Sequence, residues 1–436
     1  MTHTRSRATA PRRTTAVAVA TLFTLASLAI GVYAGAQQGN AGAAGSSGAY
    51  PLGTRENFTA PEYSSASFRS MERIFHTRRV KRSGEVSKLT RASEPFAIRY
   101  RWDGAERTVE DLAARTDSTG ILVLHDGTIL FEGYYRGADE TSRFLSMSVG
   151  KSFVSTLVGL AIGDGLIGSV DEPVTRYLPE LASSGYDGVA IERILQMSSG
   201  IAFTEEYDQP DSDVFKLFAP MIAGTGRLNE VAASFGRARE PGSKFYYASN
   251  DTQILGMLVA RVTKQTLSDY MAAKLWGPLG AEDDALWLTD RGGADGMEMA
   301  FGGLNVRLRD YGRFGLLMAR EGSWNGKQLL PASWVERATV PRSPQVMHGK
   351  LYPGYPMGYG YQWWCFPPPG RAFTGQGVYG QLLMVDPDLD LVVVKTSAWP
   401  VAWDDKKEAE SYVFFDAVRT YVRTKRAASG AKASGR

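Results

Sequence analysis

Apolar residues form short runs interrupted by turn residues in two regions that lie far apart in the chain, a pattern typical of β-hairpins. Residues 120–135 (GILVLHDGTILFEGYY) contain two apolar runs separated by Asp126-Gly127, a strong signal for a two-residue turn. Residues 379–397 contain two further runs around Asp386-Pro387-Asp388. Each half of the chain therefore supplies a hairpin, and we expect the two hairpins to complete one antiparallel sheet.

Helical periodicity dominates the stretch between these hairpins. Residues 151–165 (KSFVSTLVGLAIGDG) are apolar on nearly every side and end at glycines, as a buried helix would. Residues 408–425 predict an amphipathic closing helix. The predicted fold class is therefore α+β: an antiparallel sheet built from N- and C-terminal segments and flanked by helices, with a mainly helical lobe, residues 151–318, inserted in it.

The first 36 residues have the composition of an export segment. Four arginines among residues 5–13 precede an uncharged, mostly apolar run, residues 14–36. Ala34-Gly35-Ala36 fits a small-x-small cleavage site, which favours a signal peptide. The run is also close to the roughly 20 residues that span a membrane, so an uncleaved anchor that tethers the protein is the alternative. Both alternatives predict an exported body, periplasmic or extracellular.

The remaining boundaries follow from composition. Residues 37–60 begin with a Gly, Ala and Ser-rich stretch that predicts a flexible linker. Residues 426–436 predict a basic, disordered tail. Because no second linker of comparable length occurs between these two segments, we expect residues 61–425 to form one domain.

Charge and cysteine content exclude several classes of function. The chain has 49 Lys and Arg against 46 Asp and Glu, so no basic surface for nucleic acid is indicated. Its single cysteine, Cys365, excludes an internal disulfide and a thiolate metal cluster. The few histidines have no metal-ligand spacing. We therefore expect no metal, no cofactor and no nucleic-acid partner.

Candidate chemistry is concentrated in SVGKS, residues 148–152, which has two interpretations. A nucleotide-binding phosphate loop also requires a glycine five positions before Gly150, where this chain has Leu145. The alternative is a serine nucleophile, Ser148, with Lys151 three residues later and therefore on the same helical face. Ser148 at the helix start would present its N–H to an oxyanion, and burial would lower the pKa of Lys151 and make it a base. The nucleophile interpretation is favoured.

Two later segments carry matching chemistry. Tyr247 and Ser249 stand at the start of an apolar helical run, and Gly375, Gly377 and Gly380 enter a strand, where glycines allow a backbone to approach a ligand closely. In this order, the three segments resemble the motifs of the penicillin-recognising serine hydrolases. They are most similar to the class C β-lactamase-related branch that includes 6-aminohexanoate-dimer hydrolases and carboxylesterases.

The resemblance implies a β-lactamase-like fold and a set of roles. Ser148 would attack a carbonyl, Lys151 and Tyr247 would transfer its proton, and the N–H groups of Ser148 and Val378 would form the oxyanion hole. The implied substrate-binding residues are Tyr207, Asp213, Ser249, Gly377, Gly380 and Gln381. The implied partner is a small amide or ester substrate.

The third motif departs from the penicillin-binding pattern. Residues 373–377 are FTGQG and offer no cation for a substrate carboxylate. Lys395-Thr396-Ser397 lies one strand too late, and we interpret it as the polar end of a strand. The sequence therefore favours amide or ester hydrolysis over β-lactamase activity. A protein that is acylated without turnover, a sensor or binding protein, is the alternative.

Overall fold

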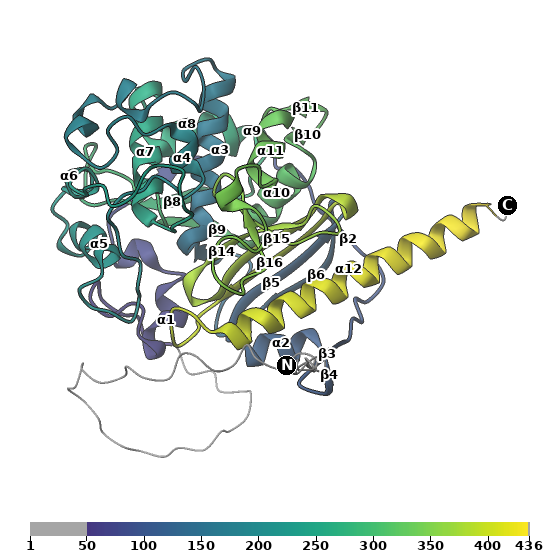
Figure 1. The fold of residues 1–436 in the computed structure, drawn as a ribbon. Coiled ribbons are helices and arrows are strands. Elements are labelled where there is room, and N and C mark those ends of the chain that lie inside the picture. The colour runs from purple at the N-terminus through teal and green to yellow at the C-terminus, as the bar shows by residue number, and fades with distance from the viewer. Residues whose placement is uncertain (1–49, 435–436) are drawn as a thin grey trace, which may run out of the picture. The chain divides into compact units, whose positions relative to one another are not determined.

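The computed structural model describes residues 50–434, with side chains to residue 428. Its main sheet has eight strands, in the order β12-β13-β14-β15-β16-β5-β6-β2 (Figure 1). Their bounds are β2 Thr90–Arg91, β5 Ser118–His125, β6 Thr128–Tyr134, β12 Gly358–Tyr359, β13 Trp364–Cys365, β14 Phe373–Gly377, β15 Gln381–Asp386 and β16 Leu391–Ser397. The N- and C-terminal halves meet where β16 pairs antiparallel with β5. The predicted fold class and both predicted hairpins are therefore confirmed.

Alternation along β5 divides the core into two layers. Leu122 and Leu124 belong to the large core on one face, whereas Ile121 and Val123 belong to a smaller core on the other. This is the period of two that a strand imposes on its side chains. The smaller core is covered by α12 (Asp405–Ser434), α2 (Val109–Arg115) and the β3–β4 hairpin (Tyr100–Trp102, Ala105–Arg107), as Figure 1 shows.

The large core joins the sheet to the helical lobe. Helix α10 (Leu308–Ala319) packs on β5, β15 and β16, and α3 (Gly150–Gly163) packs against α7 (Ser249–Thr263) (Figure 1). The other helices are α1 Pro61–Ser67, α4 Ile191–Leu195, α5 Asp213–Ala223, α6 Leu228–Ala232, α8 Leu267–Met271, α9 Gly277–Leu279 and α11 Ala332–Thr339. A small hairpin, β10–β11, spans Ser323–Trp324 and Lys327–Gln328. Helix α3 is buried along nearly its whole length, as its sequence predicts.

The segment predicted to be helical also contains strands. A second sheet has the order β1-β8-β9-β7, with bounds β1 Thr77–Val80, β7 Arg143–Leu145, β8 Ala285–Leu288 and β9 Leu304–Arg307. Strands β8 and β9 lie inside residues 151–318, so the prediction of a mainly helical lobe missed them. The reason is that β8 has only four residues, all buried, and so short an apolar run cannot be told from a segment of buried helix.

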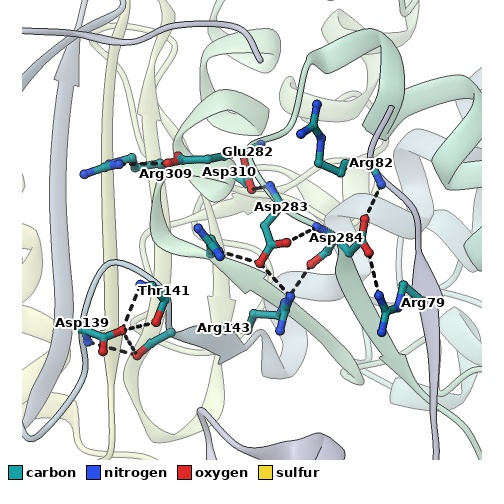
Figure 2. A network of polar contacts seen from close by, with 12 residues as sticks. Arg79, Arg82, Asp139, Thr141, Arg143, Glu282, Asp283, Asp284, Arg309 and Asp310 are labelled. Atoms are coloured by element: carbon teal, nitrogen blue, oxygen red, sulfur yellow. Dashed lines mark hydrogen bonds and ion pairs between the residues drawn. The ribbon is translucent and has the colours of Figure 1, made fainter. Parts of the chain in front are cut away.

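A polar network holds this second sheet together (Figure 2). Three consecutive acids, Glu282, Asp283 and Asp284, precede β8, and each is paired with arginine. Asp283 binds Arg143 of β7 and Arg307 of β9, both at 2.7 Å, while Asp284 binds Arg79 of β1 at 3.1 Å. Glu282 binds Arg309 at 3.0 Å, and Arg309 also binds Glu132 of the main sheet at 2.6 Å. The network therefore ties the small sheet to the large one.

The chain ends differ from the expected boundaries. Residues 50–60, predicted as part of the linker, lie against the body: Phe58 is buried among Phe68, Phe75 and Phe218. The tail predicted to be disordered from residue 426 continues α12 as far as Ser434. The predicted export segment and the first part of the linker lie outside the described residues. Within residues 50–434, no helix combines the length and apolar character needed to cross a membrane.

Candidate active site

Ser148 lies in a strained turn that leads into α3. A single 3-10 turn, Met147–Val149, precedes the helix, and Met147 has a φ of +44°, in the left-handed region that disfavours residues with a side chain. The turn is fixed from outside, since the N–H of Ser146 donates to the Leu304 carbonyl at 2.7 Å. Such strain is commonly found at functional sites. Ser148 itself stays partly exposed, whereas both of its neighbours in sequence are buried.

Lys151 lies directly below the serine hydroxyl. Its Nζ is 2.8 Å from Ser148 Oγ, and it donates to the Phe301 carbonyl at 2.6 Å. The side chain is buried, and burial lowers the pKa of Lys151 to about 8, against the opposing effect of the Glu205 carboxylate. The neutral amine, which is the form that can accept a proton from serine, is therefore roughly a tenth of the total at pH 7 and predominates above pH 8.

Tyr247 reaches the same point from just before α7. Its hydroxyl is hydrogen-bonded to Ser148, and Lys151 Nζ lies 5.3 Å from the centre of its ring. The ring stacks on Trp364 of β13 with 5.6 Å between ring centres. Burial, with a further contribution from Glu205, raises the pKa of Tyr247 well above its ordinary value. The phenol is therefore neutral and able to donate its proton.

The third motif lies beside the serine. A Cβ on Gly377, the last residue of β14, would stand 2.8 Å from the Ser146 carbonyl and 3.0 Å from the Ser148 nitrogen, so only glycine permits this approach. The next N–H along the chain belongs to Val378. The N–H of Ser148, in the first turn of its helix, has no intrahelical acceptor. These positions are consistent with the predicted oxyanion hole of Ser148 and Val378.

Three of the predicted substrate-binding residues are occupied elsewhere. Gly380 lies against the Trp399 ring, and the Gln381 amide donates to the Ser397 carbonyl at 2.8 Å and to the Tyr379 carbonyl at 3.1 Å. Asp213 accepts from the backbone N–H of Thr204 at 3.0 Å and pairs with Lys216 at 2.7 Å. None of these three residues is hydrogen-bonded to Ser148, because each makes a structural contact within its own neighbourhood.

Ser249 and Tyr207 meet at a carboxylate that the sequence did not single out. Glu205 accepts hydrogen bonds from the Ser249 hydroxyl at 2.5 Å and from the Tyr207 hydroxyl at 2.8 Å. Both hydroxyls are thus near the site but directed at Glu205. The sequence could not identify this residue, because Glu205 is one of five acids in TEEYDQPDSD, residues 204–213, and only its contacts distinguish it.

Comparison with known proteins agrees with this geometry. The family model described as Beta-lactamase matches residues 105–414. This chain is a member of that family. The chain is also 33% identical to a 6-aminohexanoate-dimer hydrolase of Paenarthrobacter ureafaciens over 310 residues, which cover 69% of this chain and 78% of that protein. It is therefore a serine hydrolase.

Solved structures of the beta-lactamase fold agree with the architecture. A putative 6-aminohexanoate-dimer hydrolase from Bacillus anthracis superimposes with a TM-score of 0.75 at 22% identity, covering 86% of this chain and 97% of that one. EstCE1, a hydrolase with promiscuous acyltransferase activity, matches with a TM-score of 0.53 at 17% identity over 66% of this chain and 91% of its own. At these identities, the structures establish the fold alone. Within residues 50–434, no group of three or more His, Cys, Asp or Glu side chains is arranged to hold a metal.

Proposed function

We propose that this beta-lactamase-family enzyme hydrolyses an amide or ester bond of a small substrate through an acyl-enzyme on Ser148. The observation that carries the proposal is the convergence of three groups: Ser148 Oγ, the Lys151 amine at 2.8 Å and the Tyr247 hydroxyl hydrogen-bonded to the serine. A hydroxyl, a neutral amine and a neutral phenol together supply a nucleophile, a base and an acid.

The reaction proceeds in two stages. Ser148 Oγ attacks the substrate carbonyl and its proton passes to Lys151, while the N–H groups of Ser148 and Val378 stabilise the negative oxygen. Tyr247 donates a proton to the departing amine or alcohol and regains one from Lys151, which leaves an ester on Ser148. Water then attacks the ester carbonyl and gives up a proton to the same pair of residues. The bond between the carbonyl carbon and Ser148 Oγ breaks, the pair returns the proton to Ser148 Oγ, and the acid is released.

Two features of the site favour amides and esters over β-lactams. The third motif carries no cation, and its two polar side chains are already bonded: Thr374 donates to the Gly375 carbonyl at 3.1 Å, and Gln376 donates to the Tyr412 hydroxyl at 2.7 Å. Apolar surface also remains exposed near Tyr247. The Tyr352 side chain is hydrogen-bonded to the backbone of Tyr247, and Tyr352 is 40% exposed. An uncharged or linear chain would pack on this surface. The name of the relative from Paenarthrobacter supports a linear amide.

Steady-state turnover tests this proposal against acylation without release. We expect the purified protein to hydrolyse a chromogenic p-nitrophenyl ester for many turnovers and to hydrolyse the matching anilide more slowly. The reason is that a water path must exist to the acyl group on the partly exposed Ser148. Release of one equivalent of nitrophenol followed by arrest would instead support a sensor or binding protein.

The pH dependence of the reaction should follow Lys151. Because the pKa of Lys151 is about 8, its amine is mostly neutral above that pH, whereas below it the amine is mostly protonated and cannot act as a base. We therefore expect kcat/KM for the ester to rise with pH through an acid limb near pH 8, measured between roughly pH 6 and 10. A flat profile across this range would contradict the assignment of Lys151 as the base.

We also infer that the enzyme works outside the cytoplasm. The arginine-rich start and the uncharged run of residues 14–36 support export, either with cleavage after Ala36 or with retention as a tether. Fractionation of cells expressing the full chain, with mass measurement of the N-terminus, tests this inference. Recovery of the intact chain in the cytoplasm would contradict it.

A further inference from the structure

Glu205 accepts three hydrogen bonds at one edge of the active site. Its Oε2 accepts the backbone N–H of Ser249 at 2.5 Å, and its Oε1 accepts the hydroxyls of Ser249 at 2.5 Å and of Tyr207 at 2.8 Å. The carboxylate belongs to the loop between α4 and α5, whereas Ser249 begins α7. A single side chain therefore joins two segments that are far apart in the sequence.

The contact with Ser249 stabilises the start of α7. Residue 248, which precedes the helix, is alanine and has no side chain that could accept a hydrogen bond from the first turn. Glu205 takes over that function from another segment, and its negative charge lies at the positive end of the helix dipole. Because Tyr247 is two residues before Ser249, the same contact limits where its phenol can lie.

The loop that carries Glu205 is itself held in place. The backbone N–H of Thr204 donates to the Asp213 carboxylate at 3.0 Å, and the N–H of Asp213 donates to the Thr204 hydroxyl at 2.8 Å. This reciprocal pair closes the loop immediately before Glu205. It also explains why Asp213, which the resemblance implied as a substrate-binding residue, has a structural position instead.

The charge of Glu205 acts on both proton-transfer groups. Burial lowers the pKa of Lys151 and Glu205 opposes this shift, while burial and Glu205 together raise the pKa of Tyr247. Four other titratable groups lie close by. Burial raises the pKa values of Tyr207 and Tyr359, partial burial raises that of Tyr352, and burial raises that of Asp251 to about 8, so all four are largely neutral at neutral pH.

We propose that Glu205 is a positioning residue for the hydrolysis, which fixes Tyr247 through the start of α7 and provides the negative charge facing Lys151 and Tyr247. This inference rests on the proposed function, since it assigns Glu205 a part in the proton transfer of that reaction. Glu205 makes no contact with Ser148 and acts only through its neighbours.

Three variants separate the charge of Glu205 from its hydrogen bonds. Glu205→Gln keeps the size of the side chain, and its amide can still accept the Ser249 N–H while donating to the two hydroxyls. Glu205→Asp keeps the charge but shortens the reach. Glu206→Gln removes the same charge from the next, exposed residue and is the matched control.

The measurement is the second-order rate of labelling by a fluorophosphonate as a function of pH, with kcat for the ester in parallel. For Glu205→Gln we expect the acid limb to move to lower pH, because removing the nearby negative charge lowers the pKa of Lys151. For Glu205→Asp we expect a limb close to that of the native enzyme with kcat reduced roughly 10- to 100-fold, the cost of a small misplacement. Glu206→Gln should match the native enzyme in both.

The outcomes distinguish this inference from the proposed function. Native labelling with a limb near pH 8, together with a Glu205→Gln variant whose limb and rate are unchanged, would overturn the positioning role and leave the acyl-enzyme mechanism intact. If Glu205→Gln and Glu205→Asp lose rate and Tm together while the acid limb stays near pH 8, Glu205 would be only a structural cap of α7. Absence of labelling in the native enzyme would overturn the proposed function itself.

Discussion

Replacing Ser148 with alanine is expected to abolish fluorophosphonate labelling and to lower kcat/KM for an ester by roughly 10⁴- to 10⁶-fold. The reason is chemical: the other groups at the site, Lys151 and Tyr247, are placed to move a proton to and from the serine oxygen and have no nucleophile to serve without it. The native fold should survive, because Ser148 is partly exposed and its hydroxyl leaves only a small space.

Ser152→Ala provides the matched control for this prediction. Ser152 lies in the first turn of α3, where its hydroxyl donates to the Gln362 carbonyl at 2.8 Å, away from the proposed nucleophile. It is also the residue that a phosphate loop would use to hold Mg²⁺. We expect Ser152→Ala to be labelled like the native protein. Persistent labelling of Ser148→Ala would refute the nucleophile assignment, and tight ATP binding that Ser152→Ala abolishes would support the nucleotide interpretation.

Removing either proton-transfer group should have the next largest effect. Lys151→Ala and Tyr247→Phe are each expected to slow acylation by roughly 10²- to 10⁴-fold, as is usual for a positioned acid or base. The Tyr247→Phe change keeps the ring stacked on Trp364 and removes only the hydroxyl that is bonded to Ser148. Pre-steady-state release of nitrophenol measures the acylation step directly.

Lys395 offers a control of the same residue type. It is buried in β16 on the side of α12, hydrogen-bonds the Ser397 hydroxyl at 2.7 Å, and has a pKa that burial lowers to about 7. Lys395→Met should therefore retain acylation. If Lys151→Ala retained it as well, Lys151 would not be the base.

The Lys395→Met control is also expected to change the stability of the protein in a pH-dependent way. An unfolded lysine keeps its ordinary pKa near 10.4, so between about pH 7 and that value the unfolded chain binds more protons at Lys395 than the folded protein does. Burial of Lys395 therefore destabilises the folded protein, most strongly at the lower end of this range, and the free energy of unfolding increases with pH. We expect Lys395→Met to have a higher Tm than the native protein near pH 7, and a Tm that increases less with pH. Thermal unfolding at several pH values measures both.

Local patterns were sufficient for the elements of the main sheet. The apolar runs on either side of Asp126-Gly127 and of Asp386-Pro387-Asp388 located both hairpins, because each run holds a strand of six to eight residues and a turn signal separates it from its partner. The same patterns failed for β8, because its four residues make too short an apolar run to distinguish from a buried helix. They also placed residues 50–60 in a linker. A single aromatic residue, Phe58, holds that segment to the body through partners far away in the sequence, and a local pattern does not reveal such contacts.

The sequence by itself determined the spacing of Ser148 and Lys151, since residues three apart share one face of a helix whatever surrounds them. The resemblance named Tyr247 and Gly377 as site residues, but only the packing of α7 and β14 in the tertiary structure shows that they reach Ser148. Glu205 is distinguished from the neighbouring acids solely by the three hydrogen bonds it accepts. Helical geometry is local and can be read from residue spacing, whereas contacts across the core depend on how all the elements pack together.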